Sequence, residues 1–102
     1  MRSIRVSTTF AATLDDLLAR GEPIYGAGLI KSKRLAVRAT LLLFADFPLL
    51  KRPHPTLGLV VYTVPGTPFV VLYDFDDHEL RVHFIFQKSA SLDELDPRSA
   101  QW

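Results

Sequence analysis

"VPGTPFVVLY", residues 64 to 73, is the stretch of the sequence that decides the fold. Its two prolines fix φ and lack an amide donor, so they suit a corner and are poor within a central strand. Gly66, between them, can take the positive φ that a tight turn requires. The residues from Phe69 to Tyr73 are apolar on both alternating faces. They therefore predict a central strand that is covered on both sides.

Two further runs rich in β-branched and aromatic residues flank this strand. They are "LVVYTV" at 59–64 and "LRVHFIF" at 80–86. The connections, residues 65–68 and 76–78, are so short that neighbouring strands must be antiparallel. The sequence thus predicts a three-stranded meander whose register is set by the proline-glycine corner.

The first half of the chain predicts a strand and two helices. "IRVSTTF" at 4–10 alternates apolar and polar residues as a short strand does. "FAATLDDLLARG" at 10–21 has apolar residues at helical spacing, and Gly21 is the expected end of this helix. The segment from Ala27 to Phe47 has no glycine after Gly28 and carries apolar residues on one helical face, so it is the expected main helix.

The C-terminal stretch "SLDELDP" at 91–97 predicts one helical turn, because Ser91 and Glu94 have capping-box spacing and Pro97 stops the turn. The expected fold class is therefore α+β, as a single domain over residues 1–102. An N-terminal strand leads into a helical hairpin that packs on one face of an antiparallel β-meander, followed by the short helical turn.

Composition excludes several classes of protein. The 102 residues include no cysteine, which excludes disulfides and thiolate metal sites, and a net charge of +1 argues against a general nucleic-acid coat. No apolar run is long enough to span a bilayer or to form a signal peptide, so we expect a cytoplasmic protein that does not contact a membrane. Hydrophobic residues make up 48% of the chain, and we expect part of this apolar surface to be covered by a partner.

The chain resembles the RelE/ParE superfamily of bacterial toxins over roughly residues 4 to 92. The resemblance rests on a leading strand, an "LDDLLA" helix, a helix ending in "LLLFADFP" and the stretch "VPGTPFVVLYDFDDHELRV". It implies the toxin of a type II toxin–antitoxin module, in a hetero-oligomer with a cognate antitoxin. RelE-like members cleave messenger RNA in the ribosome, whereas ParE-like members inhibit DNA gyrase and are not nucleases.

Departures from the family pattern favour the ParE-like function. The family often carries an arginine where this chain has Val60 and Val61, and ends its last strand with histidine, glycine and arginine. Here residues 86–90 read "FQKSA", and neither Gln87 nor Ala90 can move a proton or hold a phosphate charge. The sequence thus favours a toxin that binds and inhibits a target such as gyrase over an enzyme. The alternatives are a metal-independent, ribosome-dependent mRNA endoribonuclease and a non-toxic antitoxin-binding member.

If the chain is a nuclease, its candidate catalytic residues are Arg52, His54, Arg81 and His83. Arg81 and His83 lie two apart on the last strand, on one face with Ile85, while the loop residues could converge on the same face. The alternative is a solvated sheet face beside a basic loop. Two histidines without a carboxylate at ligand spacing make a poor metal site, and no cofactor motif is present.

Two further sets of residues are candidates for binding partners. The predicted contacts to a target or to phosphate are basic residues of the main helix and of the loop after it: Lys31, Arg34, Arg38, Lys51 and Arg52. The alternative for the helical ones is a solvated polar face. The predicted antitoxin contacts are apolar residues of the central strand and the C-terminal stretch: Val70, Leu72, Leu92 and Leu95. Trp102 is either a free tail or a surface anchor.

Overall fold

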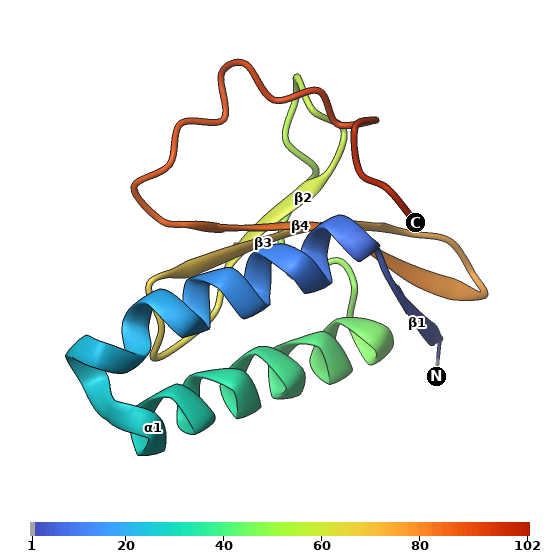
Figure 1. Cartoon of the computed structure of the whole chain (residues 1–102). Helices are drawn as coiled ribbons and strands as arrows, with labels where there is room; N and C mark the ends of the chain where they lie inside the picture. The colour runs from blue at the N-terminus through green and yellow to red at the C-terminus, as the bar shows by residue number, and fades with distance from the viewer. Residues whose placement is uncertain (1) are drawn as a thin grey trace.

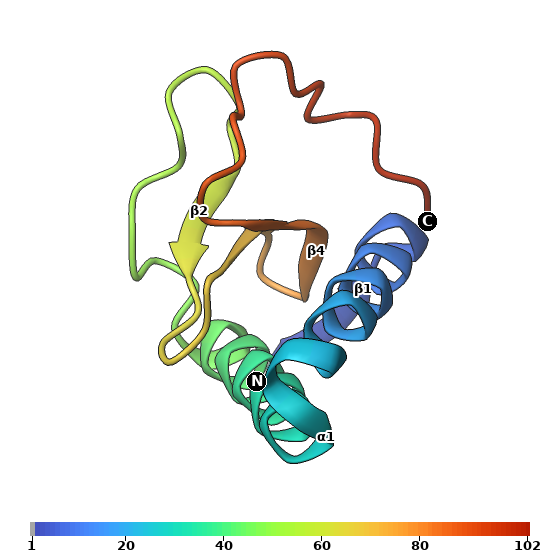
Figure 2. The same ribbon diagram turned by 60° about the vertical axis from the view of Figure 1, so that its left-hand side comes forward.

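The computed structural model describes residues 2–102, and Figure 1 shows their arrangement. The elements in chain order are β1 (Ser3–Val6), α1 (Thr8–Asp46), β2 (Val60–Thr63), β3 (Phe69–Phe75) and β4 (Glu79–Gln87). The helical layer lies on one side of the sheet, and the C-terminal segment crosses the other side (Figure 2). No helix within residues 2–102 has both the length and the apolar character needed to cross a membrane.

The sheet contains the predicted meander and one strand more. Its order is β1-β4-β3-β2, and both pairings of the meander are antiparallel. β1 joins the far edge by pairing parallel to β4, with Ser3 opposite Glu79 and Val6 opposite Val82. The sheet is therefore mixed, which corrects the purely antiparallel prediction. Parallel pairing requires a long crossover, and here residues 7–78 supply it.

The proline-glycine corner forms as the sequence predicts. Gly66 has a φ of 74°, in the region that favours glycine. The amide of Val64 donates to the Phe69 carbonyl at 2.9 Å, and the Thr67 hydroxyl donates to the Val64 carbonyl at 2.9 Å. These bonds close the turn, so β2 and β3 meet in one register.

α1 is one bent helical element and not two helices joined by a loop, so the predicted helical hairpin is wrong in its connection. Helical structure continues past Gly21 and Pro23, and the only non-helical backbone inside α1 is at Gly26, with φ 80° and ψ 162°. The two halves fold back on each other there (Figure 1), and Arg34 reaches Asp15 at 3.2 Å. Residues this far apart in sequence would be about 28 Å apart in a straight helix.

The main core lies between α1 and the sheet. Phe44 of α1 stacks on Tyr73 of β3 with ring centroids 4.1 Å apart. The Tyr73 hydroxyl donates to the carbonyl of Pro48 at 2.6 Å, so the end of α1 is tied to the central strand. Burial, together with the nearby Tyr62, raises the pKa of Tyr73 to about 12.

A β-bulge at His83 changes which residues of β4 face the helices. Leu72 pairs with Phe84 and Tyr73 pairs with Val82, so His83 has no partner of its own on β3. Beyond the bulge Ile85 joins the core under α1, whereas Phe84 packs with Leu72 on the outer face. The prediction that Ile85 lies in line with Arg81 and His83 is therefore wrong, because strict alternation fails at a bulge.

The outer face of the sheet carries a second, smaller core cluster. It is formed by Leu57, Leu59, Leu72 and Phe84, and residues of the C-terminal segment pack against it. This segment contains turns but no helix, and the Ser91 hydroxyl accepts from the amide of Asp93 at 3.4 Å and not from that of Glu94. The predicted C-terminal helical turn is therefore wrong, since the segment crosses the sheet through separate turns, two of which are closed by the amides of Leu95 and Ser99 donating to the carbonyls of Leu92 and Asp96.

The last residues of the chain lie against the start of α1. The carbonyl of Gln101 accepts from the amides of Thr8 and Thr9 at 2.7 and 3.3 Å, and the Ser7 hydroxyl accepts from the amide of Phe10 at 2.8 Å. The first amides of a helix lack partners within the helix, and these oxygens satisfy three of them. The C-terminal segment is thereby fixed at both of its ends.

Candidate functional site

Arg81 is held by three carboxylates near the β3–β4 turn. Its Nε is 3.0 Å from Asp74 Oδ1, and its Nη1 is 2.8 Å from Asp76 Oδ2 and 3.1 Å from Glu79 Oε1. These bonds, those to Asp74 foremost, raise the pKa of Arg81. The Arg81 guanidinium and the amides of His78 and Glu79 hold the pKa of Asp76 well below its usual range. A cation surrounded by carboxylates is a poor receptor for phosphate.

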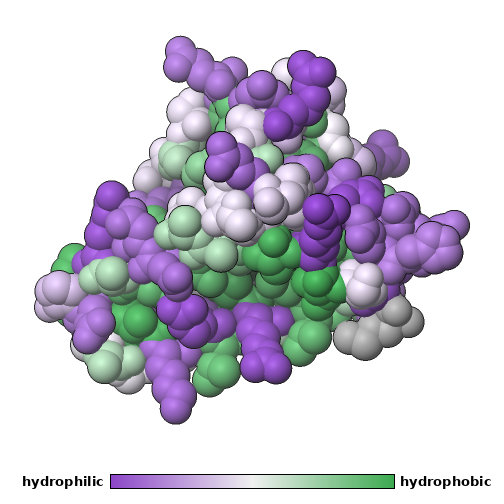
Figure 3. Space-filling view, turned by 45° about the vertical axis from the view of Figure 1, so that its right-hand side comes forward, coloured by the Kyte–Doolittle hydropathy of each residue, from purple (hydrophilic) through white to green (hydrophobic). Residues whose placement is uncertain are grey.

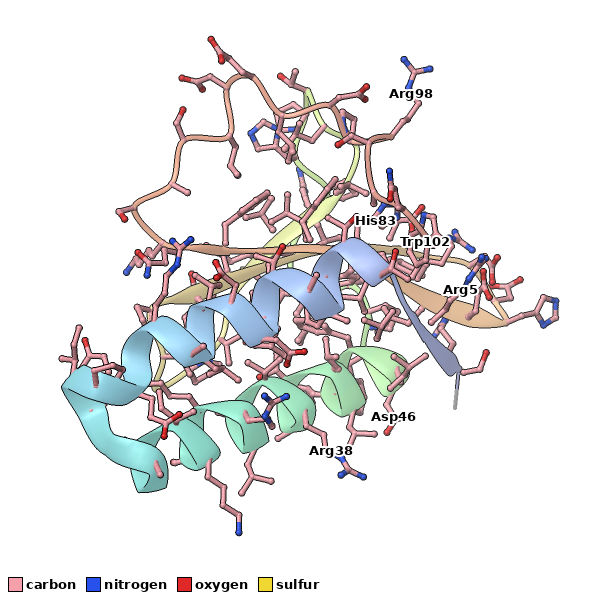
Figure 4. The ribbon with its side chains drawn as sticks, viewed as in Figure 1. Arg5, Arg38, Asp46, His83, Arg98 and Trp102 are labelled. Atoms are coloured by element: carbon pink, nitrogen blue, oxygen red, sulfur yellow. The ribbon has the colours of Figure 1, made fainter. Side chains whose placement is uncertain are left out.

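His83 is wedged between a carboxylate and the last residue of the chain. Its Nε2 is 2.8 Å from Asp74 Oδ1, and its ring meets Trp102 edge-on with centroids 4.9 Å apart. Its Nδ1 is buried and has no hydrogen-bond partner within residues 2–102. Trp102 also lies 5.0 Å from the Arg5 guanidinium, as Figure 4 allows the reader to follow. Trp102 is thus an anchor and not a free tail.

The loop candidates do not join Arg81 and His83. His54 Nδ1 accepts from the amides of Thr56 and Leu57 at 3.2 and 3.3 Å, so the ring caps its own loop. Among the described residues, no hydrogen bond or ion pair links Arg52 or His54 to Arg81 or His83. Contacts within the loop occupy the His54 ring, and contacts within the hairpin occupy Arg81 and His83. The convergence of these four residues on one site stays a prediction.

No group of three or more histidine, aspartate or glutamate side chains within residues 2–102 is arranged to hold a metal ion. The acidic residues around Arg81 point at its guanidinium. The chemistry available on this face is therefore that of an ion-pair cluster in which carboxylates outnumber the guanidinium.

The predicted antitoxin contacts lie on the outer face of the sheet, but this face is already covered. Leu72 is fully buried, and Leu92 and Leu95 are part of the cover that the chain lays over it. Leu72 is not accessible to a partner in this conformation, so its prediction as a groove residue is corrected. Val70 is half-buried, and its role as a partner contact stays a prediction.

The predicted basic stripe does lie together on the exposed side of α1. Lys31, Arg34 and Arg38 are all exposed along its second half. Arg34 pairs with Asp15, although both side chains are more than half exposed, so the pair contributes about 1 kcal/mol or less. Within residues 2–102, neither Lys31 nor Arg38 makes an ion pair, and Lys51 in the following loop lies 6.0 Å from the Tyr62 ring.

The same layer and the loop after it expose large apolar side chains. Figure 3 shows hydrophobic areas between charged side chains over the lower, helical part of the molecule. In α1 and the loop after it, the large apolar residues with at least two fifths of their surface exposed are Ile24, Tyr25, Leu29, Leu35, Leu42, Leu43, Phe47, Leu49 and Leu50. The signal was present in the sequence, since the helical members of this set give α1 an apolar band wider than one sheet can cover.

A hollow of about 150 Å³ lies at the bend of α1, against the start of β3. Leu17, Ile30 and Phe69 form part of its lining, together with Lys33 and with Arg20, whose guanidinium also pairs with Asp16 at 2.9 Å on the exposed surface. The exposed Ile24 and Tyr25 complete this side of the hollow. Sequence reasoning missed these residues because it ended the first helix at Gly21.

The fold is similar to that of a solved toxin–antitoxin structure. No protein-family model matches the chain, and no curated protein matches it by sequence. A chain of a structure described as "Chromosomal ParDE TA system from P. aeruginosa" matches with a TM-score of 0.74. It is 17% identical, and the match covers 85% of this chain and 96% of that one. The likeness shows a shared fold, which is the fold that the resemblance to the RelE/ParE superfamily predicts.

Proposed function

We propose that this protein is the toxin of a type II toxin–antitoxin module, that it acts by binding and inhibiting a target such as DNA gyrase, and that a cognate antitoxin neutralises it. The observation that carries the ParE-like mechanism is the state of Arg81. Its guanidinium already bonds to Asp74, Asp76 and Glu79. Nuclease chemistry on RNA needs a cation free to meet developing phosphate charge.

The two histidine candidates, His54 and His83, support the same conclusion. His54 uses Nδ1 to cap a loop, and His83 is packed under Trp102. A general base must come within hydrogen-bond reach of the proton that it abstracts, and the His83 side chain is only 14% exposed. The fold likeness to a chain of a ParDE system points in the same direction.

The surface best suited to an antitoxin is the hollow at the bend of α1. It combines an apolar lining with the exposed Ile24 and Tyr25 and with the positive charge of Arg20 and Lys33. An amphipathic antitoxin segment with one apolar anchor and flanking acidic residues would match both properties. Val70, Leu92 and Leu95, which are all half-buried on the outer face of the sheet, remain candidates from the predicted set.

Two assays separate this function from the alternative of a ribosome-dependent endoribonuclease. Purified protein should inhibit supercoiling of a plasmid by gyrase, and its expression should stop DNA replication. Primer extension on a translated message should show no new cleavage. Codon-phased cleavage that is lost in Arg81→Ala and His83→Ala, but kept in the surface control Arg98→Ala, would refute the proposal.

Loss of toxicity alone would not identify the antitoxin surface. Tyr25→Asp should weaken capture by the antitoxin while gyrase inhibition by the free toxin remains. A chain that inhibits neither gyrase nor translation but still binds the antitoxin would be a non-toxic member of the superfamily.

A further inference from the structure

We infer that the outward side of the second half of α1 is a surface for self-association, on which a second copy of this chain packs antiparallel around Leu42. We name this surface the Leu42 face and define it as Leu35, Arg38, Ala39, Leu42 and Asp46. These positions recur at helical spacing and are all exposed, with Leu35 at 55% and Leu42 at 42%. The inference is independent of the proposed function.

The Leu42 face has apolar residues along its centre and one charge of each sign beside them. Arg38 and Asp46 both project away from the rest of the molecule, below the helix in Figure 4. They are eight residues apart, or about 12 Å along the helix, so they cannot pair with each other within one copy. Within residues 2–102, neither makes an ion pair.

The order of residues along the face is complementary to itself. Arg38 comes four residues before Leu42, and Asp46 comes four residues after it. A two-fold axis at Leu42 therefore brings Arg38 of each copy level with Asp46 of the other, while the two Leu42 side chains meet at the axis. Leu35, seven residues before Leu42, then lies level with the segment just beyond Asp46, the last residue of the other copy's α1.

This symmetry is what favours a second copy over an unrelated partner. A different protein would need apolar residues on this face, but it would not require opposite charges at equal distances on either side of a central leucine. Stable interfaces bury at least roughly 1,200 Å², and we expect a contact made by one half-helix of each copy to bury less than that. The dimer should therefore be weak, with a Kd of about 10–100 µM.

Sedimentation equilibrium of the full chain, up to about 200 µM, tests the inference with charge-swap variants. Wild type should follow a monomer–dimer equilibrium, and Leu42→Asp should raise Kd by about 20-fold or more. Arg38→Glu and Asp46→Arg should each weaken the dimer, because each places like charges opposite one another. The double variant Arg38→Glu/Asp46→Arg should return Kd to within about threefold of wild type.

A matched control distinguishes association through the Leu42 face from nonspecific association of exposed apolar residues. Ile24→Asp changes a more exposed apolar residue of α1 outside the Leu42 face and should leave Kd unchanged. Circular dichroism should show all variants folded, because every substituted side chain is exposed. A chain that stays monomeric at the highest concentration would overturn the inference. So would a dimer that survives Leu42→Asp, that also responds to Ile24→Asp, or that the double variant does not restore.

Discussion

Replacing Leu72 by alanine should cost as much stability as a core substitution, although Leu72 lies on the side of the sheet away from α1. Its side chain is fully buried against Leu57, Leu59 and Phe84. Three carbon groups at about 0.8 kcal/mol each give a transfer term of about 2.4 kcal/mol. The cavity adds roughly 1 kcal/mol, because the irregular cover can partly collapse into it. We expect a loss of about 3 kcal/mol.

Urea unfolding followed by far-UV circular dichroism measures this loss directly. The midpoint should fall while the slope m stays constant, since the surface exposed on unfolding hardly changes. Leu42→Ala is the matched control, because it removes the same atoms from an exposed site and should cost less than about 1 kcal/mol. Phe69→Ala, on the face under α1, should cost about 3–5 kcal/mol.

The result also decides how the outer face is used. If Leu72→Ala costs less than about 1 kcal/mol, the cover made by residues 88–102 does not hold in solution. Weakened antitoxin binding in that variant would then restore the outer face as a groove, and the reasoning from burial would be refuted.

Three further predictions concern the turn, an ion pair and a buried tyrosine. Gly66→Ala should lower the free energy of unfolding by about 1 kcal/mol or more, and with it the thermal midpoint, because φ is 74° at this position. Gly28→Ala in α1, which has equally open space and no positive φ, should not destabilise the protein. The pKa of Asp76 is depressed in the folded state, so the carboxylate stabilises the fold above its unfolded pKa of about 4, and this stabilisation is lost as pH falls through the folded pKa. In Asp76→Asn, the free energy of unfolding should therefore fall less steeply with decreasing pH, and an unchanged acid dependence would contradict this. The pKa of Tyr73 is raised to about 12, so stability should fall as pH rises from about 10 to 12, and in Tyr73→Phe a pH titration of the unfolding midpoint should lose this step.

The meander was predictable because its information is local. The corner at residues 65–68 has residues that only a turn accommodates, and the strands on either side are too close to pair in any other way. The parallel pairing of β1 with β4 joins residues about 76 positions apart, and four residues of strand carry no signal for it. The end of the first half of α1 was ambiguous, since Gly21, Pro23, Gly26 and Gly28 are all plausible breaks.

The bulge shows why periodicity failed at the site. From Val82 onward β4 reads "VHFIF", and a run of apolar residues looks the same before and after its faces exchange. Only the register against β3 reveals that His83 is the extra residue. The face of each residue beyond the bulge therefore depended on tertiary pairing.

The state of Arg81, by contrast, could have been inferred from the sequence. The β3–β4 turn is short, so Asp74 and Arg81 must face each other across the hairpin, and Glu79 lies on the same face two residues away. Opposite charges directly across a strand pair neutralise each other before any ligand arrives. An arginine in such a place stabilises the hairpin, and its presence on a sheet face is weak evidence for phosphate binding. The positive charge free to meet a partner lies instead on α1, at Lys31 and Arg38, beside the exposed apolar residues. The helical layer therefore carries the free positive charge and the exposed apolar surface that suit contact with another protein, whereas the sheet does not.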